Sequence, residues 1–222
     1  MYIEYPNEQT VRFVYDGNSY VNYIEREYIY YDCDKDSEIY RINVFFENGQ
    51  KSTWISDIVC RYGNALLVDS YGRYIFGCSL RGIYCCDLKT GMLVWRKKKM
   101  AKRIIMNDDD TLTCEWHKQL FVIDLSGNVL REVNTRYDVA IFYLGENKFM
   151  MRNCKSTWII LSSMLDVLYT IPHQIISSGA GIRSADIFKD HLTIKFWVKD
   201  ETMVDQNNER RINLAQYVNR QQ

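Results

Sequence analysis

The sequence lacks several features that would point directly to a function. It carries no net charge, because 28 basic side chains balance 28 acidic ones, so no overall field attracts nucleic acid or an anionic membrane. No run of 18 apolar residues occurs, and the first residues have neither the charged region nor the apolar region of an export signal. We therefore expect a soluble, cytoplasmic protein without membrane contact, whose partners are chosen by local surface patches.

Motifs for metal binding and catalysis are also missing from the sequence. No pair among the seven cysteines has Cys-x-x-Cys spacing, and His117, His173 and His191 lie far apart, which argues against a zinc site. No Gly-x-Ser-x-Gly, His-Glu-x-x-His or Cys/His arrangement is present. We expect no cofactor, no metal and no catalytic residue. The cysteines, including the adjacent Cys85 and Cys86, are interpreted as reduced thiols that fill the core.

What the chain does contain is a repeated pattern of short apolar strands and polar turns. The 17 tyrosines and the 14% share of aromatic residues favour strands. The clearest unit runs from Ile83 to Trp95, where a turn that ends at Gly91 separates two strands and Gly91 can adopt φ > 0. Its motif Asp87–Gly91 is echoed by Asp124–Gly127, 37 residues later (124 − 87). The sequence therefore predicts a repeat architecture.

Five such units, each of four short strands, account for most of the chain. Units of this kind about 40 residues apart are typical of a β-propeller. We predict an all-β fold, a small propeller that forms one domain over residues 1–222. Eleven glycines and two prolines are few for so many turns, which leaves a β-sandwich or a two-domain α+β fold as alternatives. The predicted blades span residues 20–55, 65–96, 102–133, 139–171 and 184–218.

Two details of this prediction concern the N-terminal part of the chain. The strand at residues 10–15 has no partner of its own before the first blade, and we expect it to complete the last blade and close the ring. Within the first blade, a turn is predicted at Glu25 to Glu27, between the strands Tyr20–Ile24 and Tyr28–Tyr31.

The segment Tyr84–Trp95 resembles the end of the repeat found in PQQ-like (quinoprotein dehydrogenase-like) propellers, an architecture related to WD40 propellers. That repeat has a small residue, an Asp, a Gly four residues after the Asp, and a closing Trp, and the last three correspond here to Asp87, Gly91 and Trp95. In the second copy the glycine comes one residue early and Arg131 stands where Trp would fall. The resemblance implies a propeller architecture and implies no quinone or calcium site.

The tryptophans recur in several of the predicted units. Large aromatic side chains at equivalent positions are expected to wedge between blades as part of the core, and one or two of them to anchor a partner. These residues are Trp54, Trp95, Trp116, Trp158 and Trp197.

Loops predicted to share one face of the propeller carry opposite charges. The basic segment Arg96–Lys102 has five cations in seven residues, and the turn Asp32–Glu38 is acidic. Contact with an acidic protein, a nucleic-acid footprint and a solvated loop are all open for the basic segment, and nucleic acid is disfavoured because the segment has no interleaved aromatics. The candidate partner-binding residues are Arg61, Tyr62, Arg81, Arg96, Lys97, Lys98, Lys99, Lys102, His117, Arg136 and Tyr137.

The acidic turn has carboxylates at alternate positions, as calcium loops do, because a hard cation needs several oxygens from one tight turn. Its candidate ligands are Asp32, Asp34, Asp36 and Glu38. However, Ser37 replaces the usual glycine and Lys35 adds a positive charge. A polar hairpin turn is therefore the preferred interpretation, and no metal is predicted.

The sequence favours a non-catalytic protein-binding module. A small, free-standing propeller of this kind looks like a bacterial immunity or inhibitor protein, so we expect one protein partner, a toxin or enzyme that the chain neutralises. The alternative is a carbohydrate-binding or glycoside-cleaving five-bladed propeller, in which Asp138 and Asp186 would act as acid and base at a channel mouth. A structural subunit of a larger assembly is a third alternative.

Overall fold

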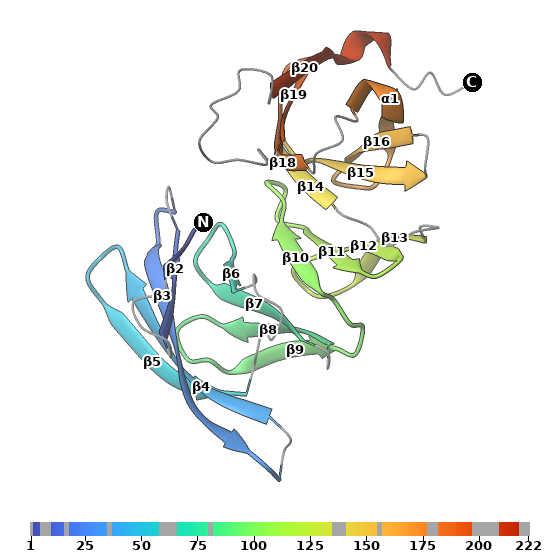
Figure 1. Cartoon of the computed structure of the whole chain (residues 1–222). Helices are drawn as coiled ribbons and strands as arrows, with labels where there is room; N and C mark the ends of the chain where they lie inside the picture. Colours follow the sequence, from blue (N-terminus) through green and yellow to red (C-terminus); the bar gives the residue numbers. More distant parts are fainter. Residues whose placement is uncertain are drawn as a thin grey trace. The chain divides into compact units, whose positions relative to one another are not determined.

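The computed structural model describes residues 2–4, 10–15, 18–34, 37–57, 66–79, 82–134, 141–154, 157–176, 182–196 and 209–217. Nearly all regular structure in these ranges is β-strand (Figure 1), which confirms the predicted all-β class. The helical elements in these ranges are short, α1 (His173–Ile176) and a 3-10 turn at Leu214–Gln216. None of the helices in these ranges has the length and apolar character needed to cross a membrane.

The strands form five antiparallel sheets that follow one another along the chain. The first sheet contains β1 (Tyr2–Glu4), β2 (Thr10–Val14), β3 (Val21–Asp32), β4 (Ser37–Phe46) and β5 (Lys51–Ser56). The second contains β6 (Leu67–Val68), β7 (Tyr74–Ser79), β8 (Gly82–Asp87) and β9 (Leu93–Lys97). The third contains β10 (Arg103–Met106), β11 (Leu112–Trp116), β12 (Gln119–Ile123) and β13 (Val129–Asn134).

The two remaining sheets complete the series. The fourth contains β14 (Ile141–Gly145), β15 (Lys148–Cys154), β16 (Thr157–Ser162) and β17 (Val167–Pro172). The last contains β18 (Ile182–Phe188), β19 (His191–Phe196) and β20 (Glu209–Asn213). Successive meanders of this kind are the sheet composition of a small β-propeller, so the predicted fold class is confirmed.

The chain divides into two compact units. The first comprises residues 1–106 with 124–128, and the second comprises residues 107–123 with 129–222. In the first unit, Phe13, Ile24 and Phe76 are among the fully buried side chains. In the second unit, the side chains of the fourth and fifth sheets form one apolar cluster that includes Met150 and Leu192. Burial of these large side chains is the main stabilising contribution in each unit.

The N-terminal strand belongs to the first sheet, so the prediction that it completes the last sheet was wrong. β2 pairs antiparallel with β3, with Phe13 opposite Ile24, and both side chains are buried. Arg12 adds an ion pair to Glu25 at 2.7 Å. Pairing with the next strand along the chain also closes a short loop, which costs less entropy than pairing with a strand at the other end. The last sheet has three strands among the described residues.

β3 is one continuous strand of 12 residues, where the sequence predicted two strands and a turn at Glu25 to Glu27. The charged side chains stay in the strand because neighbouring strands supply their partners. Glu25 pairs with Arg12 of β2, and Glu27 pairs with Arg41 of β4 at 2.8 Å. Glu25 and Glu27 therefore form ion pairs with neighbouring strands. The predicted turn was wrong.

Tryptophans on two outer strands pack against the following hairpin turn, as predicted for wedges between blades. The indole N–H of Trp54 in β5 donates to the carbonyl of Leu88 at 3.3 Å, and that of Trp95 in β9 donates to Leu125 at 2.7 Å. The glycines of these turns lie against the rings, since a Cβ on Gly91 would be 2.4 Å from Trp54 and one on Gly127 would be 3.0 Å from Trp95. Each tryptophan thus packs on the turn glycine of the next sheet, and both contacts lie within the first unit.

The third sheet makes the corresponding contact without a tryptophan. Arg131 of β13 forms an ion pair with Asp166, which follows β16, at 2.5 Å. Both side chains are nearly half exposed, and such pairs contribute only about 0 to 1 kcal/mol. An ion pair therefore stands where the first two sheets have a tryptophan. It stabilises the packing of adjacent sheets less than a buried indole does.

Candidate functional site

The hairpin of β3 and β4 extends beyond its neighbouring strands as a two-stranded arm (Figure 1). The flanking strands β2 and β5 end at the level of Glu27 and Tyr40. Past this level, among the residues that the structure describes, β3 and β4 pair with each other as far as Asp32. We call residues 28–34 and 37–40 the tyrosine arm.

Three tyrosines of the arm are exposed: Tyr28, Tyr30 and Tyr31 have 36%, 51% and 44% of their surface accessible. Tyr28 also packs edge to face against Tyr40, with ring centroids 5.7 Å apart. Rings held on a paired backbone offer a large contact area and lose little conformational entropy on binding. The sequence pointed to this site only through its high tyrosine content, because exposure depends on where the flanking strands end.

Tyr40 stabilises the base of the arm. Its hydroxyl donates to the Glu38 carboxylate at 2.6 Å. Burial and the adjacent Glu38 raise the pKa of Tyr40 well above its ordinary value. The phenol therefore stays protonated as a hydrogen-bond donor, which fixes both side chains.

The tip of the arm contains the predicted acidic turn. Asp32 accepts a hydrogen bond from the backbone N–H of Asp34 at 3.1 Å, as expected for an Asx turn. Asp36 lies outside the described residues, and within them no group of three His, Cys, Asp or Glu side chains is placed to hold a metal ion. Asp32 and Glu38 thus make contacts that belong to a polar hairpin, and no observation favours calcium.

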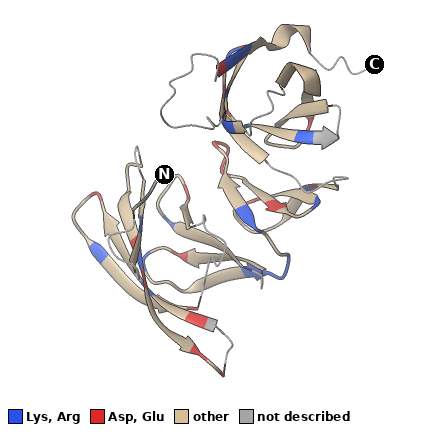
Figure 2. Ribbon diagram, viewed as in Figure 1, with Lys and Arg blue, Asp and Glu red and all other residues tan. Residues whose placement is uncertain are grey.

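The predicted basic segment begins in β9 and continues into the loop that follows it. Trp95 on one side and Ala101, which is 1% exposed, on the other hold the segment against the unit. The side chains of Arg96, Lys98 and Lys102 are exposed, whereas Lys97 and Lys99 are half-buried. Figure 2 shows basic residues at the end of β9 and acidic residues near the tip of the arm.

Two contacts fix the first residues of the basic segment. The guanidinium of Arg96 lies 5.2 Å from the ring centroid of Tyr84 on the neighbouring strand β8. The backbone of Lys97 passes so close to Gly82 that a Cβ there would be 1.9 Å from the Lys97 carbonyl oxygen. Gly82 has a φ of +131°, so both space and backbone conformation require glycine at this position. The strand end that presents the cations is therefore rigidly placed.

The remaining predicted partner-binding residues are not described on the unit that carries the tyrosine arm and the basic segment. His117 lies in the β11–β12 turn of the second unit, is exposed, and packs edge to face on Trp116 with ring centroids 4.5 Å apart. The others lie outside the described residues. These are Arg61, Tyr62, Arg81, Arg136 and Tyr137.

The structure describes one of the two carboxylates of the carbohydrate alternative. Asp186 is exposed on β18, opposite Thr193 of β19. Asp138 lies outside the described residues. The structure therefore adds no observation in favour of glycoside cleavage.

The four buried cysteines that the structure describes belong to the core, as predicted for this residue type. Cys85 and Cys86 are each 1% exposed and form no disulfide. Burial raises the pKa of each thiol to about 12, so neither is a thiolate at neutral pH. The others are Cys78 and Cys114, whereas Cys33 at the tip of the arm is exposed.

The first unit also contains a cavity that the sequence did not predict. Its volume is about 450 Å³. Residues from four separate connections line it, between β2 and β3, β4 and β5, β6 and β7, and β8 and β9. Its polar and aromatic lining includes Tyr20, Glu47, Gln50, Tyr71, Arg73 and Lys89.

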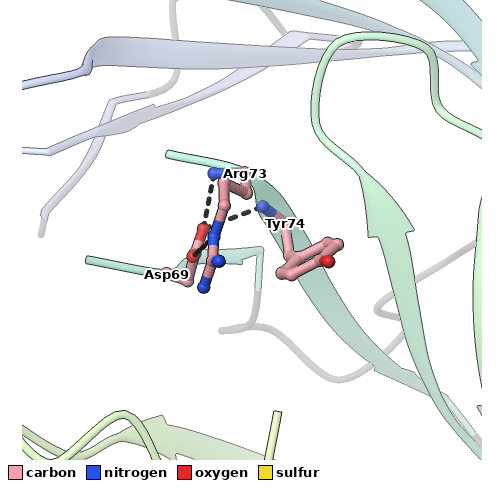
Figure 3. Close-up of polar contacts among 3 residues, drawn as sticks. All are labelled: Asp69, Arg73 and Tyr74. Carbon is pink, nitrogen blue, oxygen red and sulfur yellow. Dashed lines mark hydrogen bonds and ion pairs between the residues drawn. The ribbon is translucent and has the colours of Figure 1, made fainter. Parts of the chain in front are cut away.

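A fully buried carboxylate, Asp69, forms polar contacts with Arg73, one of the residues that line this cavity, and with Tyr74 (Figure 3). It accepts hydrogen bonds from the backbone N–H groups of Arg73 and Tyr74 at 2.7 and 2.8 Å, and from the Arg73 side-chain Nε at 3.2 Å. The guanidinium also lies 4.6 Å from the Tyr71 ring centroid and 5.3 Å from that of Tyr74. Arg73 is thus held by its own turn at the edge of the cavity.

Comparison with known proteins supports the fold and goes no further. No protein-family model and no curated protein sequence matches the chain. The structure of Saccharomyces cerevisiae Sqt1, a WD40 protein, matches with a TM-score of 0.52 at 9% identity, over 78% of this chain and 52% of Sqt1. The chain thus spans about half the length of Sqt1. At this identity the likeness shows the fold alone, an all-β chain of propeller type.

Two further structures are similar at lower scores. BamB from Moraxella catarrhalis, a PQQ-like propeller, matches with a TM-score of 0.46 at 12% identity, over 82% of this chain and 69% of BamB. The computationally designed Ika8 protein matches with a TM-score of 0.48 at 10% identity, over 86% of this chain and 66% of Ika8.

Proposed function

We propose that the chain is a non-catalytic protein-binding module. The observation that carries the proposal is the tyrosine arm, which presents Tyr28, Tyr30 and Tyr31 on strands that extend past their neighbours. Exposed tyrosines are enriched at the centres of protein interfaces, where the ring buries apolar area and the hydroxyl forms a hydrogen bond. A preorganised arm of this kind suits contact with a protein surface.

Charge on the same unit supports a protein partner. The arm ends in the carboxylates of Asp32 and Asp34, and the basic segment presents Arg96, Lys98 and Lys102. A partner that carries a basic patch beside an apolar one would complement the arm, and an acidic patch would complement the basic segment. Complementary charges of this kind raise the association rate and select the partner.

Within this class, we propose a cytosolic inhibitor or immunity-type protein that neutralises one toxin or enzyme. The exposed groups of the arm and the basic segment are tyrosine rings and charged side chains, which suit contact with a protein over roughly 800 Å² per side. The buried thiols of Cys85 and Cys86 are not available as nucleophiles. Both points support binding as the activity of this chain.

The proposal is tested by crosslinking and affinity measurements on the intact chain. A photoreactive amino acid at position 30 should crosslink one protein from the native host in stoichiometric amount. The double variant Tyr30→Ala, Tyr31→Ala should weaken binding of that protein at least tenfold, because the rings are the proposed anchors. Tyr143→Ala, which removes a tyrosine of the second unit that is 37% exposed, should leave the affinity unchanged.

Two results would count against different parts of the proposal. Equal affinities of the wild type and the arm variant, or the absence of any stoichiometric partner, would contradict binding through the arm. A partner that binds through the arm but keeps its full activity in the complex would contradict only the inhibitor role.

A further inference from the structure

We propose that the cavity beside Arg73 binds a monocarboxylate that carries hydroxyl or amide groups, with its carboxylate on the end of the Arg73 side chain. The site goes beyond the proposed function and does not depend on it. The cavity and the tip of the arm lie at opposite ends of β3, whose 12 residues span on the order of 35 Å. Occupancy of the cavity and binding through the arm can therefore be measured separately.

The orientation of the Arg73 side chain is fixed through one nitrogen of its guanidinium. Nε donates to Asp69 at 3.2 Å, and within the described part of the chain the two terminal nitrogens form no hydrogen bond or ion pair. The side chain is 54% exposed. The two terminal N–H groups of a guanidinium match the two oxygens of a carboxylate end-on. Asp69 and the ring of Tyr71 hold the fork in place before a ligand arrives.

The acidic residues in and beside the cavity do not occupy the terminal nitrogens of Arg73. Besides the Arg73 Nε, Asp69 accepts the backbone N–H groups of Arg73 and Tyr74, so its charge is shared with the backbone. Asp87 accepts from the N–H and hydroxyl of Thr90 at 2.8 Å each, which directs its carboxylate into its own turn. Glu47 is exposed, lines the cavity and accepts from the side-chain amide of Asn22, and its negative charge disfavours a dianion such as phosphate.

The other walls supply apolar and polar contacts for the rest of the ligand. Tyr20 and Tyr71 are 46% and 54% exposed, so their rings offer apolar area. Tyr20 lies directly on the turn, since a Cβ on Gly72 would be 2.5 Å from its Cβ. Gln50 and Lys89 add hydrogen-bonding groups. A volume of about 450 Å³ is within the range of small-molecule sites.

The test is a titration of the intact chain, labelled with ¹⁵N-arginine and observed by NMR. Glucuronate represents a free sugar acid, and N-acetylglycine represents the carboxylate of a peptide terminus. The Arg73 Nε signal should shift with at least one of them and respond tenfold less to the uncharged glucose and N-acetylglycinamide. The probe that binds more tightly identifies the source of the carboxylate.

Variants separate recognition from folding. Arg73→Lys keeps the charge but lacks the fork, and it should raise the dissociation constant at least tenfold while thermal unfolding stays close to wild type. Arg41→Gln, which removes a partly exposed arginine on β4, should leave the constant unchanged. An unshifted Arg73 signal with both acids, tighter binding of inorganic phosphate, or an unchanged constant in Arg73→Lys would overturn the proposal.

Discussion

The indole N–H of Trp54 donates to the backbone carbonyl of Leu88, in the turn of the next sheet, and Gly91 of that turn lies against the same ring. The same relationship joins Trp95 to Leu125. The turn motif that defines one sequence repeat is therefore completed by a tryptophan of the preceding sheet. The contribution of this contact to stability can be tested at Gly91, because the Trp54 ring and the positive φ both disfavour a side chain there.

Gly91→Ala is expected to destabilise the protein by about 2 to 4 kcal/mol. Its φ of +70° disfavours a side chain by about 1 to 2 kcal/mol, and the new Cβ would also overlap the Trp54 ring at 2.4 Å. Gly49→Ala is the matched control, because Gly49 has a φ of +81° and no atom within 4 Å of the added Cβ. Urea unfolding of both variants should show a larger loss for Gly91→Ala, and equal losses would refute the ring contact.

Features carried by neighbouring residues could be predicted from the sequence, whereas those built from distant segments could not. Asp87, Gly91 and the tryptophans revealed the repeat because a hairpin turn and its glycine are local. The pairing of Glu25 with Arg12 was hidden, since a charged run looks the same in a turn and in a paired strand. The cavity was also missed, because Tyr20, Glu47 and Arg73 come from three connections that only the sheets bring together.

Phe13→Ala is expected to cost about 3 to 5 kcal/mol of stability, the usual loss for a buried phenylalanine. Phe13 is 1% exposed and pairs with Ile24 of β3, so the measurement tests the placement of the N-terminal strand in the first sheet. Val11→Ala on the same strand, where the side chain is only half-buried, should cost clearly less. The comparison is made by chemical denaturation, and similar small losses in both variants would contradict this placement.

Native thiol reactivity should distinguish the exposed cysteine from the buried ones. Cys33→Ser is expected to remove one thiol that reacts quickly with Ellman's reagent at pH 8, because Cys33 is exposed. Cys85→Ser should leave the number of quickly reacting thiols unchanged, since burial raises the pKa of Cys85 to about 12 and keeps the reagent away. Loss of a quickly reacting thiol in Cys85→Ser would show that β8 is accessible.

Asp87 should contribute to the loss of stability in acid. Although partial burial acts in the opposite direction, hydrogen bonds from the Thr90 hydroxyl and from the N–H groups of Thr90 and Lys89 lower the pKa of Asp87. A lowered pKa in the folded state means that the stabilisation is present above the ordinary value of about 4 and is lost as the pH falls below it. Asp87→Asn should therefore lower Tm at pH 6 and flatten the fall of Tm below about pH 4.

Thr90→Val is a second variant to be measured over the same pH range. It removes one of the hydrogen bonds to the carboxylate but keeps the charge, so its acid dependence should lie between those of the wild type and Asp87→Asn. Asp186→Asn, at an exposed position on β18, is the control and should follow the wild-type curve. If Asp87→Asn loses stability in acid as steeply as the wild type, the carboxylate of Asp87 does not hold its turn through charge.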